Sequence, residues 1–572
     1  MNIPNRSAGA NPHAPERSAR TTGRGVWPLL SRIHARMARY WPEVIGLALI
    51  MLVAAFLRLN NLQTRAQWDS DQGSDMFALW NALHSGTIPQ LGPLASTGTF
   101  HHGALYYDLM LPAAWLGGGS PAWVLVETAL GGLLVVPIVW WVARSIGGRA
   151  AGLAAALLAA TAGSLVFFST FIWNPTLVEP GAALALLGAW QAWSSRNPAW
   201  LLAAAAGTAM AMQAHIAASV LVLPMGMVLV ALVWRGPVGQ RRRIALWGAA
   251  AVALIIATYI PFIAYEVSHN FAETRGILAY LTGPDQQARH GPAYRLAVSG
   301  VRILAWPLTG WPLWGGKPNL PLAIGVAGAL AAGLTWRLAA TAVPNLRRTP
   351  MPPGDVLDLP ADSAGPRAKE RDGTWLVTCC LGAMILALGL GLGETSEIGP
   401  VLTEQYHLAA DPFVIVAVGV LLGSLWRLRV HGRWVGVLGR LVFIAALAAS
   451  AYCSAQEWPA SPNSSSWSVA QAAANRIERD AAGQSIGLVG LPGHRSTDAY
   501  GYLLFLDGTL LVAPNRASVL VVLCDSTWSR TCGGPAEDAW LAAQPYASGF
   551  ELLDRFTAAP KRTLSVYGRL ST

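Results

Sequence analysis

Eleven segments of this chain are apolar over about the length that a helix needs to cross a membrane, which is roughly 20 residues. Only 12% of the 572 residues are charged and 53% are hydrophobic, whereas soluble domains typically have about 25% charged residues. The sequence therefore predicts a mainly α-helical, polytopic membrane protein. The predicted spans are residues 43–59, 121–143, 150–171, 175–194, 199–215, 219–235, 244–265, 320–341, 374–393, 409–427 and 434–453.

The arginines predict which side of the membrane each connection faces. Basic residues gather in short cytoplasmic loops, and Arg36, Arg144, Arg242, Arg347 and Arg429 all lie outside the predicted spans. Eleven spans place these five on the side of the N-terminus, which we expect to be cytoplasmic. This pattern also accounts for the net charge of +10 without a nucleic-acid partner.

The segment Ala104 to Leu116 is apolar but short. If it crossed the membrane, Arg144 and Arg149 would fall outside. We therefore expect a partly embedded helix on the outer side, with a true span as the alternative.

Three regions flank or interrupt the transmembrane module, which we assign to residues 41–453. Residues 1–40 are predicted to be a disordered basic cytoplasmic tail, and residues 344–373 a disordered cytoplasmic insertion. Residues 454–572 are predicted to form a small extracytoplasmic α/β domain, a cap or an acceptor-recognition domain. It has an amphipathic helix at 467–479 and strands at 485–490, 518–523 and 563–567. Cys524 and Cys532 could form a disulfide if this domain is outside; two unpaired thiols are the alternative.

An acidic stretch follows the first span by about ten residues. Trp68 to Asp75 carries Asp69, Asp71 and Asp75, and a helix that ends at Gly86 follows. Acidic groups at the mouth of a membrane helix usually serve an ion, a proton or a cationic partner. The alternative is a solvated turn of Asp, Ser and Gly. We expect Asp71 just before the helix, near its positive end.

Three fragments follow the first predicted span in a fixed order, namely Asp71-Gln72, Leu83 to Gly86 and Leu105-Tyr106-Tyr107. This order resembles the GT-C class of membrane glycosyltransferases, especially the branch of protein O-mannosyltransferases and lipid A aminoarabinose transferases. In that branch an acidic pair follows the first membrane helix, then a helix ending in Leu-x-x-Gly, then a Leu-Tyr-Tyr segment. Further fragments look like a bacterial subgroup of the same class, so that the resemblance covers roughly residues 43 to 280; they are Phe171 to Pro175, Gln213-Ala214-His215, Pro261-Phe262, Tyr265-Glu266 and Thr274-Arg275.

The resemblance implies an inverting transfer of a sugar from a polyprenyl phosphate to a lipid, glycan or protein acceptor of the cell envelope. Asp71 is the implied general base. Gln72 stands where the family has its second acid, and Asp69 and Asp75 are the candidates to replace that acid, Asp69 as a second catalytic residue. The predicted substrate-binding residues are Asp75, His101, His102, Tyr106, Asn174, His215, Glu266 and Arg275.

Each of these residues also has a structural interpretation. His101 and His102 could belong to a polar loop, and Asn174 could cap a helix before Pro175. Glu266 and Arg275 could pair with each other. No metal ligands are assigned, although acids and histidines so close together could hold Mg or Mn.

Two other functions remain open on the sequence. In a transporter or flippase, the acidic stretch would be a cation or proton site, but ionisable groups should then lie within the spans. Glu127 and Glu179 are the notable ones there. A membrane scaffold would leave the polar outer groups unexplained. We therefore expect a plasma or inner membrane enzyme whose active site faces outward among membrane lipids.

Overall fold

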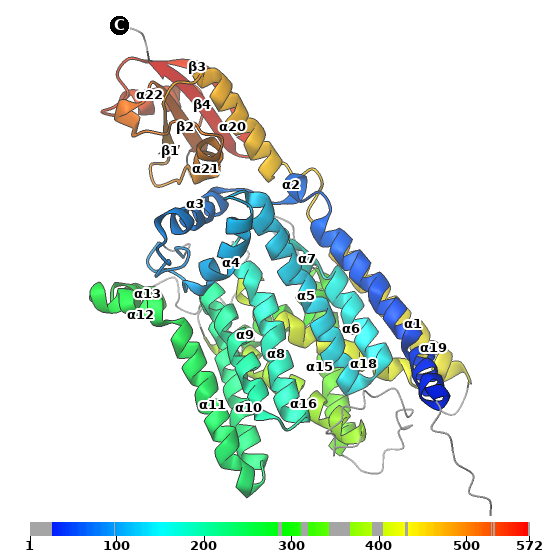
Figure 1. Ribbon diagram of the computed structural model, residues 1–572. Coiled ribbons are helices and arrows are strands. Elements are labelled where there is room, and N and C mark those ends of the chain that lie inside the picture. Colours follow the sequence, from blue (N-terminus) through cyan, green and yellow to red (C-terminus); the bar gives the residue numbers. More distant parts are fainter. Residues whose placement is uncertain are drawn as a thin grey trace, which may run out of the picture. The chain divides into compact units, whose positions relative to one another are not determined.

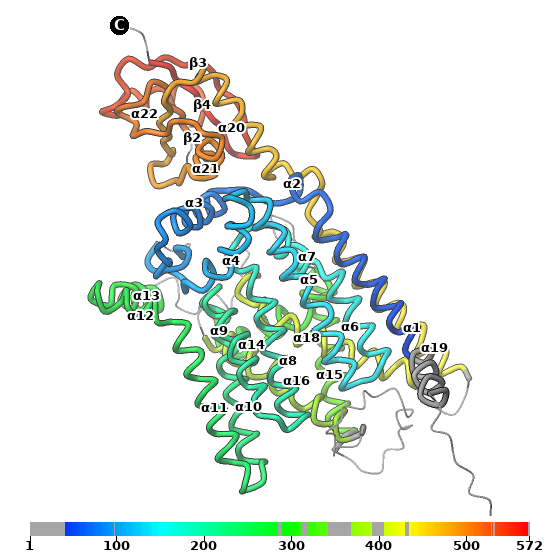
Figure 2. The backbone as a smooth tube through the Cα atoms, viewed as in Figure 1, coloured from blue at the N-terminus to red at the C-terminus, as the bar shows by residue number. Residues whose placement is uncertain are grey.

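The computed structural model describes residues 26–95, 98–283, 289–310, 319–342, 366–391, 404–428, 433–527, 529 and 532–569 (Figures 1 and 2). The chain divides into two units between Gly46 and Leu47. Helix α1 runs from Val26 to Leu59. The prediction of disorder through residue 40 is therefore wrong from Val26 onward, and residues 1–25 lie outside the described residues.

The chain is a multi-pass membrane protein. Seven described helical segments are long and apolar enough to cross a bilayer. A bent pair, α11 (Val238–Thr258) and α12 (Ile260–Ser268), meets at 53° and would be an eighth span. The seven are Tyr40–Leu59 of α1, α5 (Pro121–Gly147), Ile216–Arg235 with α10 (Val222–Arg235), α15 (Leu320–Ala342), α16 (Pro366–Leu390), α18 (Asp411–Trp426) and α19 (Arg433–Ala455).

The other predicted spans coincide with shorter helices, namely α6 (Arg149–Thr161), α8 (Val178–Ser194) and α9 (Leu201–Ala214). The count of eleven spans therefore stays a prediction. Residues 366–373 begin helix α16, so the predicted disordered insertion is wrong there, and the rest of it, to residue 365, lies outside the described residues. Helix α4 (Leu105–Leu116) has 12 residues, too few to span.

Helices α8 and α9 approach each other backbone to backbone. A Cβ atom on Gly188 would lie 2.3 Å from the nitrogen of Ala204, and one on Gly207 would lie 2.4 Å from that of Ala185. Small residues at such positions allow membrane helices to pack closely. Because α8 follows Asn174 and α9 precedes His215, this packing brings both residues to the same end of the helix pair; Asn174 donates to the carbonyl of Ala214 at 2.5 Å.

Helix α14 (Pro292–Thr309) was not predicted. Its charged residues Arg295 and Arg302 interrupt the apolar pattern, and both are buried. The apolar pattern therefore predicted that this segment lies in a loop on the outer side, between the predicted spans 244–265 and 320–341.

The C-terminal residues form a small mixed domain after α19. A four-stranded sheet has the order β1-β2-β4-β3, with β1 and β2 parallel and the other pairs antiparallel. Cys524 and Cys532 form a disulfide. The unpredicted strand is β3, where two register shifts disturb the alternating pattern. The elements are α20 (Trp467–Ala481), β1 (Ile486–Leu491), α21 (Asp498–Leu506), β2 (Val519–Asp525), α22 (Pro535–Ala542), β3 (Phe550–Ala559) and β4 (Arg562–Arg569).

Candidate functional site

Helix α3 (Ser70–Ser85) gives the three acids different positions. Asp69 is the N-cap: its side chain accepts the N–H of Ser70 at 2.7 Å, while the side-chain oxygen of Gln72 accepts the N–H of Asp69 at 2.7 Å. This reciprocal capping box fixes where the helix begins. Asp71 therefore lies in the first turn, rather than just before the helix, and Asp75 lies one turn further on.

Asp69 is held by two arginines of the C-terminal domain. Arg495 contacts its Oδ1 at 2.5 Å, and Arg562 donates to its Oδ2. Arg495 also lies 3.2 Å from Asp525. Since both of its carboxylate oxygens face guanidinium groups, Asp69 is well placed to anchor the C-terminal domain.

Helix α3 also packs against helix α21 of the C-terminal domain, which lies beside it in Figure 1. The hydroxyl of Ser74 donates to Asp498 at 2.6 Å, and the indole of Trp68 donates to the carbonyl of Ala499 at 2.6 Å. A Cβ atom on Gly73 would lie 2.1 Å from the carbonyl oxygen of Asp498. Only glycine allows this approach, so the helix that carries Asp71 is fitted to the C-terminal domain.

Residue Asp71 is exposed, although protein surrounds its carboxyl group closely enough to shift the pKa. Removal from water, with the charge of Asp69, raises the pKa of Asp71 above its usual range. Arg495, a hydrogen bond from the Trp173 side chain and Arg562 oppose this rise. An accessible carboxylate of raised pKa, oriented by a hydrogen bond, has the properties of a general base.

Asp75 is buried and enclosed by two tyrosines of α4. Tyr106 donates to its Oδ2 and Tyr107 to its Oδ1, each at 2.9 Å. Burial raises the pKa of Asp75 to about 7, although the two hydrogen bonds lower it. The Tyr106 hydroxyl thus supports Asp75, and its expected contact with substrate stays a prediction.

Gln72, the residue after Asp71, is also buried. Its amide nitrogen donates to the carbonyl of Ile172 at 2.6 Å. A carboxylate could not make this bond because it has no N–H. Gln72 therefore ties α3 to the segment that carries Trp173.

A second group of predicted residues stacks around His215. The His102 ring centre lies 5.1 Å from that of His215, which lies 5.2 Å from that of Tyr406. Burial, then the charge of His101, lowers the pKa of His102 to about 4, so its ring is neutral at neutral pH. Among the described residues none bonds to its buried Nδ1 atom, which suits a hydrogen bond with a substrate better than charge pairing.

The remaining predicted residues gather at helix α13 (Ala272–Thr282). Glu266 accepts the N–H groups of Glu273 at 2.8 Å and Thr274 at 3.0 Å, which caps the helix. Glu273 accepts the N–H of His101 at 2.6 Å and lies 3.0 Å from its Nδ1. Arg275 is exposed and donates to the carbonyl of Asn270.

The structure thus joins Asp69, Asp71, Asp75 and Tyr106 in one cluster, joins His102 to His215, and holds His101 and Glu266 at α13 near Arg275. Sequence reasoning missed four neighbours of the acidic cluster. Trp173 and Tyr107 stood inside the matching fragments, whereas Arg495 and Arg562 come from a region without any such signal. These four neighbours of the acidic cluster are Tyr107, Trp173, Arg495 and Arg562.

No group of three or more metal-ligating side chains occurs among the described residues.

No family model and no curated protein matches this chain. Two crystal structures of ArnT from Cupriavidus metallidurans, one apo and one bound to undecaprenyl phosphate, match 92% of this chain and 98% of theirs. Each has 13% identity and a TM-score of 0.55. Arabinofuranosyltransferase AftD from Mycobacteria matches over 93% of this chain and 40% of its own, with 14% identity and a TM-score of 0.41. The chain therefore has the fold of ArnT, as the resemblance in sequence implied.

Proposed function

We propose that this protein transfers a sugar from a polyprenyl-phosphate donor to an acceptor at the outer face of the membrane. The observation that carries the proposal is Asp71, an exposed carboxylate of raised pKa at the start of α3. The ArnT fold supports the choice of donor, because one of the ArnT structures was solved with undecaprenyl phosphate. The acceptor is an envelope lipid, glycan or protein that offers a hydroxyl or phosphate oxygen.

In the proposed reaction the acceptor oxygen attacks the anomeric carbon of the donor. When that oxygen belongs to a hydroxyl, its proton passes to the Asp71 carboxylate while the bond from the anomeric carbon to the phosphate oxygen breaks. The electron pair of that bond leaves with the polyprenyl phosphate. A single displacement of this kind inverts the anomeric centre. Trp173 would hold the Asp71 carboxylate in position through its hydrogen bond.

The other predicted residues take supporting roles in this proposal. Asp69 anchors the C-terminal domain through Arg495 and Arg562. His102, neutral and partly unsatisfied, offers a hydrogen bond to the sugar or phosphate. Arg275 is exposed and offers the cation for the leaving phosphate.

The test replaces Asp71 with Asn in the full-length protein in liposomes, with a panel of labelled polyprenyl-phosphate sugars. Transfer should fall about a hundred- to ten-thousand-fold, because Asn cannot accept the proton. Donor binding, measured in parallel, should persist. Asp507→Asn is the matched control, since Asp507 is an exposed acid of the C-terminal domain. Near-normal transfer by Asp71→Asn together with loss in Asp69→Asn would show that the base is misassigned.

A proton-coupled transporter is the second candidate, and one buried pair favours it. Glu179 and Asp411 share a hydrogen bond, both are buried, and both lie at the start of apolar helices. Ionisable residues inside a membrane domain often mark proton paths. If no donor supports transfer and Glu179→Gln abolishes proton flux in liposomes, this candidate replaces the transferase.

A further inference from the structure

A small basic recess lies at the far end of α8 from Asp71. Its volume is about 240 Å³, and the ends of α8 and α10 and the starts of α11 and α16 line it. Trp190 and Trp193 form part of its wall. Four basic residues line it against one acid, Asp372, which gives the lining a net charge of +3. The four are Arg196, Arg235, Lys369 and Arg371.

The single acid of the lining has two partners within it. Asp372 accepts a hydrogen bond from Arg371 at 3.0 Å and one from the Trp193 indole at 3.3 Å. Arg235 lies over the Trp193 ring at 5.3 Å. The lining thus combines a net charge of +3 with basic residues from separate segments around one small space.

The position of the recess places it at the depth of lipid head groups. Trp173, which bonds to Asp71, precedes α8, whereas Trp190 and Trp193 lie at its end; 17 residues of helix separate these ends by about 25 Å. Trp234 and Trp200, next to the recess in sequence, are 77% and 37% exposed. Exposed tryptophans at the end of membrane helices mark the interface with water.

We propose that this recess binds phosphate, supplied either by the head group of a membrane lipid or by a soluble phosphate compound. Guanidinium groups match phosphate oxygens with paired hydrogen bonds, and basic pockets between membrane helices hold anionic head groups. The inference is independent of the proposed sugar transfer.

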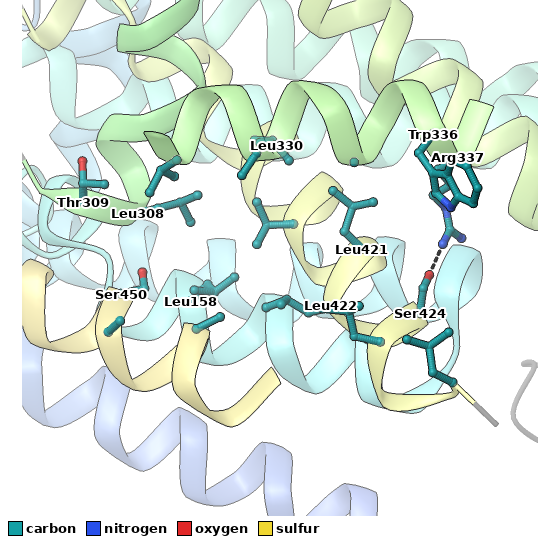
Figure 3. Close-up of a pocket in the computed structure, with 18 of the residues that line it drawn as sticks. Leu158, Leu308, Thr309, Leu330, Trp336, Arg337, Leu421, Leu422, Ser424 and Ser450 are labelled. Carbon is teal, nitrogen blue, oxygen red and sulfur yellow. Dashed lines mark hydrogen bonds between the residues drawn. The ribbon is translucent and has the colours of Figure 1, made fainter. Parts of the chain in front are cut away.

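The larger cavity of the membrane region has a different character (Figure 3). Its volume is about 900 Å³, and leucines such as Leu330, Leu421 and Leu422 line it. Of its two arginines, Arg337 bonds to Glu370 at 2.6 Å, and Arg427 does so at 3.3 Å. With two arginines bonded to one acid, the lining of this cavity has a net charge of +1, smaller than the +3 of the recess.

The experiment compares two double variants of the full-length protein. Arg196→Gln with Arg235→Gln removes two exposed charges from the recess. Arg242→Gln with Arg243→Gln removes two exposed charges from the start of α11 outside it. In the lipid arm, the protein is held in nanodiscs of phosphatidylcholine with added diphosphatidylglycerol, and retained lipids are counted by native mass spectrometry. In the soluble arm, inorganic pyrophosphate is titrated into protein in uncharged detergent.

The recess variant should retain diphosphatidylglycerol about thirtyfold more weakly than wild type, while the control variant should match wild type. That result identifies a lipid head group. If only pyrophosphate distinguishes the two variants, the recess takes a soluble phosphate compound. If neither probe distinguishes them, the proposal is overturned.

Discussion

Replacing Gly73 with Ala should separate the C-terminal domain from the helix that carries Asp71. The new Cβ atom would lie 2.1 Å from the carbonyl oxygen of Asp498 and 2.7 Å from the nitrogen of Ala499. Both neighbours are backbone atoms, which cannot rotate away. Ordinary van der Waals contact begins near 3.4 Å, so α3 and α21 must part by more than about 1 Å at this point.

The size of the effect follows from what that separation breaks. Overpacking a tight contact costs about 1–3 kcal/mol. The bonds from Ser74 to Asp498 and from Trp68 to Ala499, each 2.6 Å long, would stretch beyond normal range, at about 1 kcal/mol each. Alanine favours a helix over glycine by about 1 kcal/mol. The net loss of docking free energy is therefore about 2–4 kcal/mol.

Hydrogen exchange of the full-length protein measures this loss. Peptides covering residues 69–75 and 496–502 should exchange about thirtyfold faster or more in Gly73→Ala. Gly382→Ala is the matched control, because Gly382 lies within α16 and a Cβ there would meet nothing within 4 Å. Exchange at wild-type rates in Gly73→Ala would refute the described contact between α3 and α21.

Three further predictions test charge and topology. Burial raises the pKa of Asp75 from 3.8 to about 7. The neutral carboxyl therefore stabilises the fold below pH 3.8, and this contribution is lost as the pH rises to about 7. In Asp75→Asn, the unfolding midpoint should depend less on pH between 3.8 and 7. Arg495 lowers the pKa of Asp71, so Arg495→Gln should move the acid limb of the transfer rate to higher pH, whereas Arg476→Gln, which breaks an ion pair within the C-terminal domain, should not. A cysteine probe at position 360 should react with an impermeant reagent only after cells are opened, and reaction in intact cells would contradict the predicted topology.

The membrane helices could be predicted because lipid imposes long apolar segments, and that requirement is visible in any one segment alone. Helix α14 was not predicted because it contains Arg295 and Arg302. Both arginines are buried, and composition alone does not show that. Strand β3 was not predicted because its two register shifts break the alternation of apolar and polar side chains along the strand.

The candidate site was predictable only where its residues are neighbours in sequence or share a family fragment. Asp71 was expected from the resemblance, although the structure places it in the first turn of α3 and not before the helix. Its arginine neighbours Arg495 and Arg562 lie more than 400 residues away in the chain and approach through tertiary packing. The bond from Tyr106 to Asp75 likewise joins two helices, α3 and α4, whose packing no local pattern specifies.

The fit between α3 and α21 has a consequence for evolution and for engineering. Two backbone segments held at glycine distance, with an indole donating to a main-chain carbonyl, leave little tolerance for independent change on either side. Recombination that brings in a foreign C-terminal domain would therefore need to carry residues 68–74 with it. Chimeras cut between these two segments should lose activity, and those that exchange them jointly should keep it.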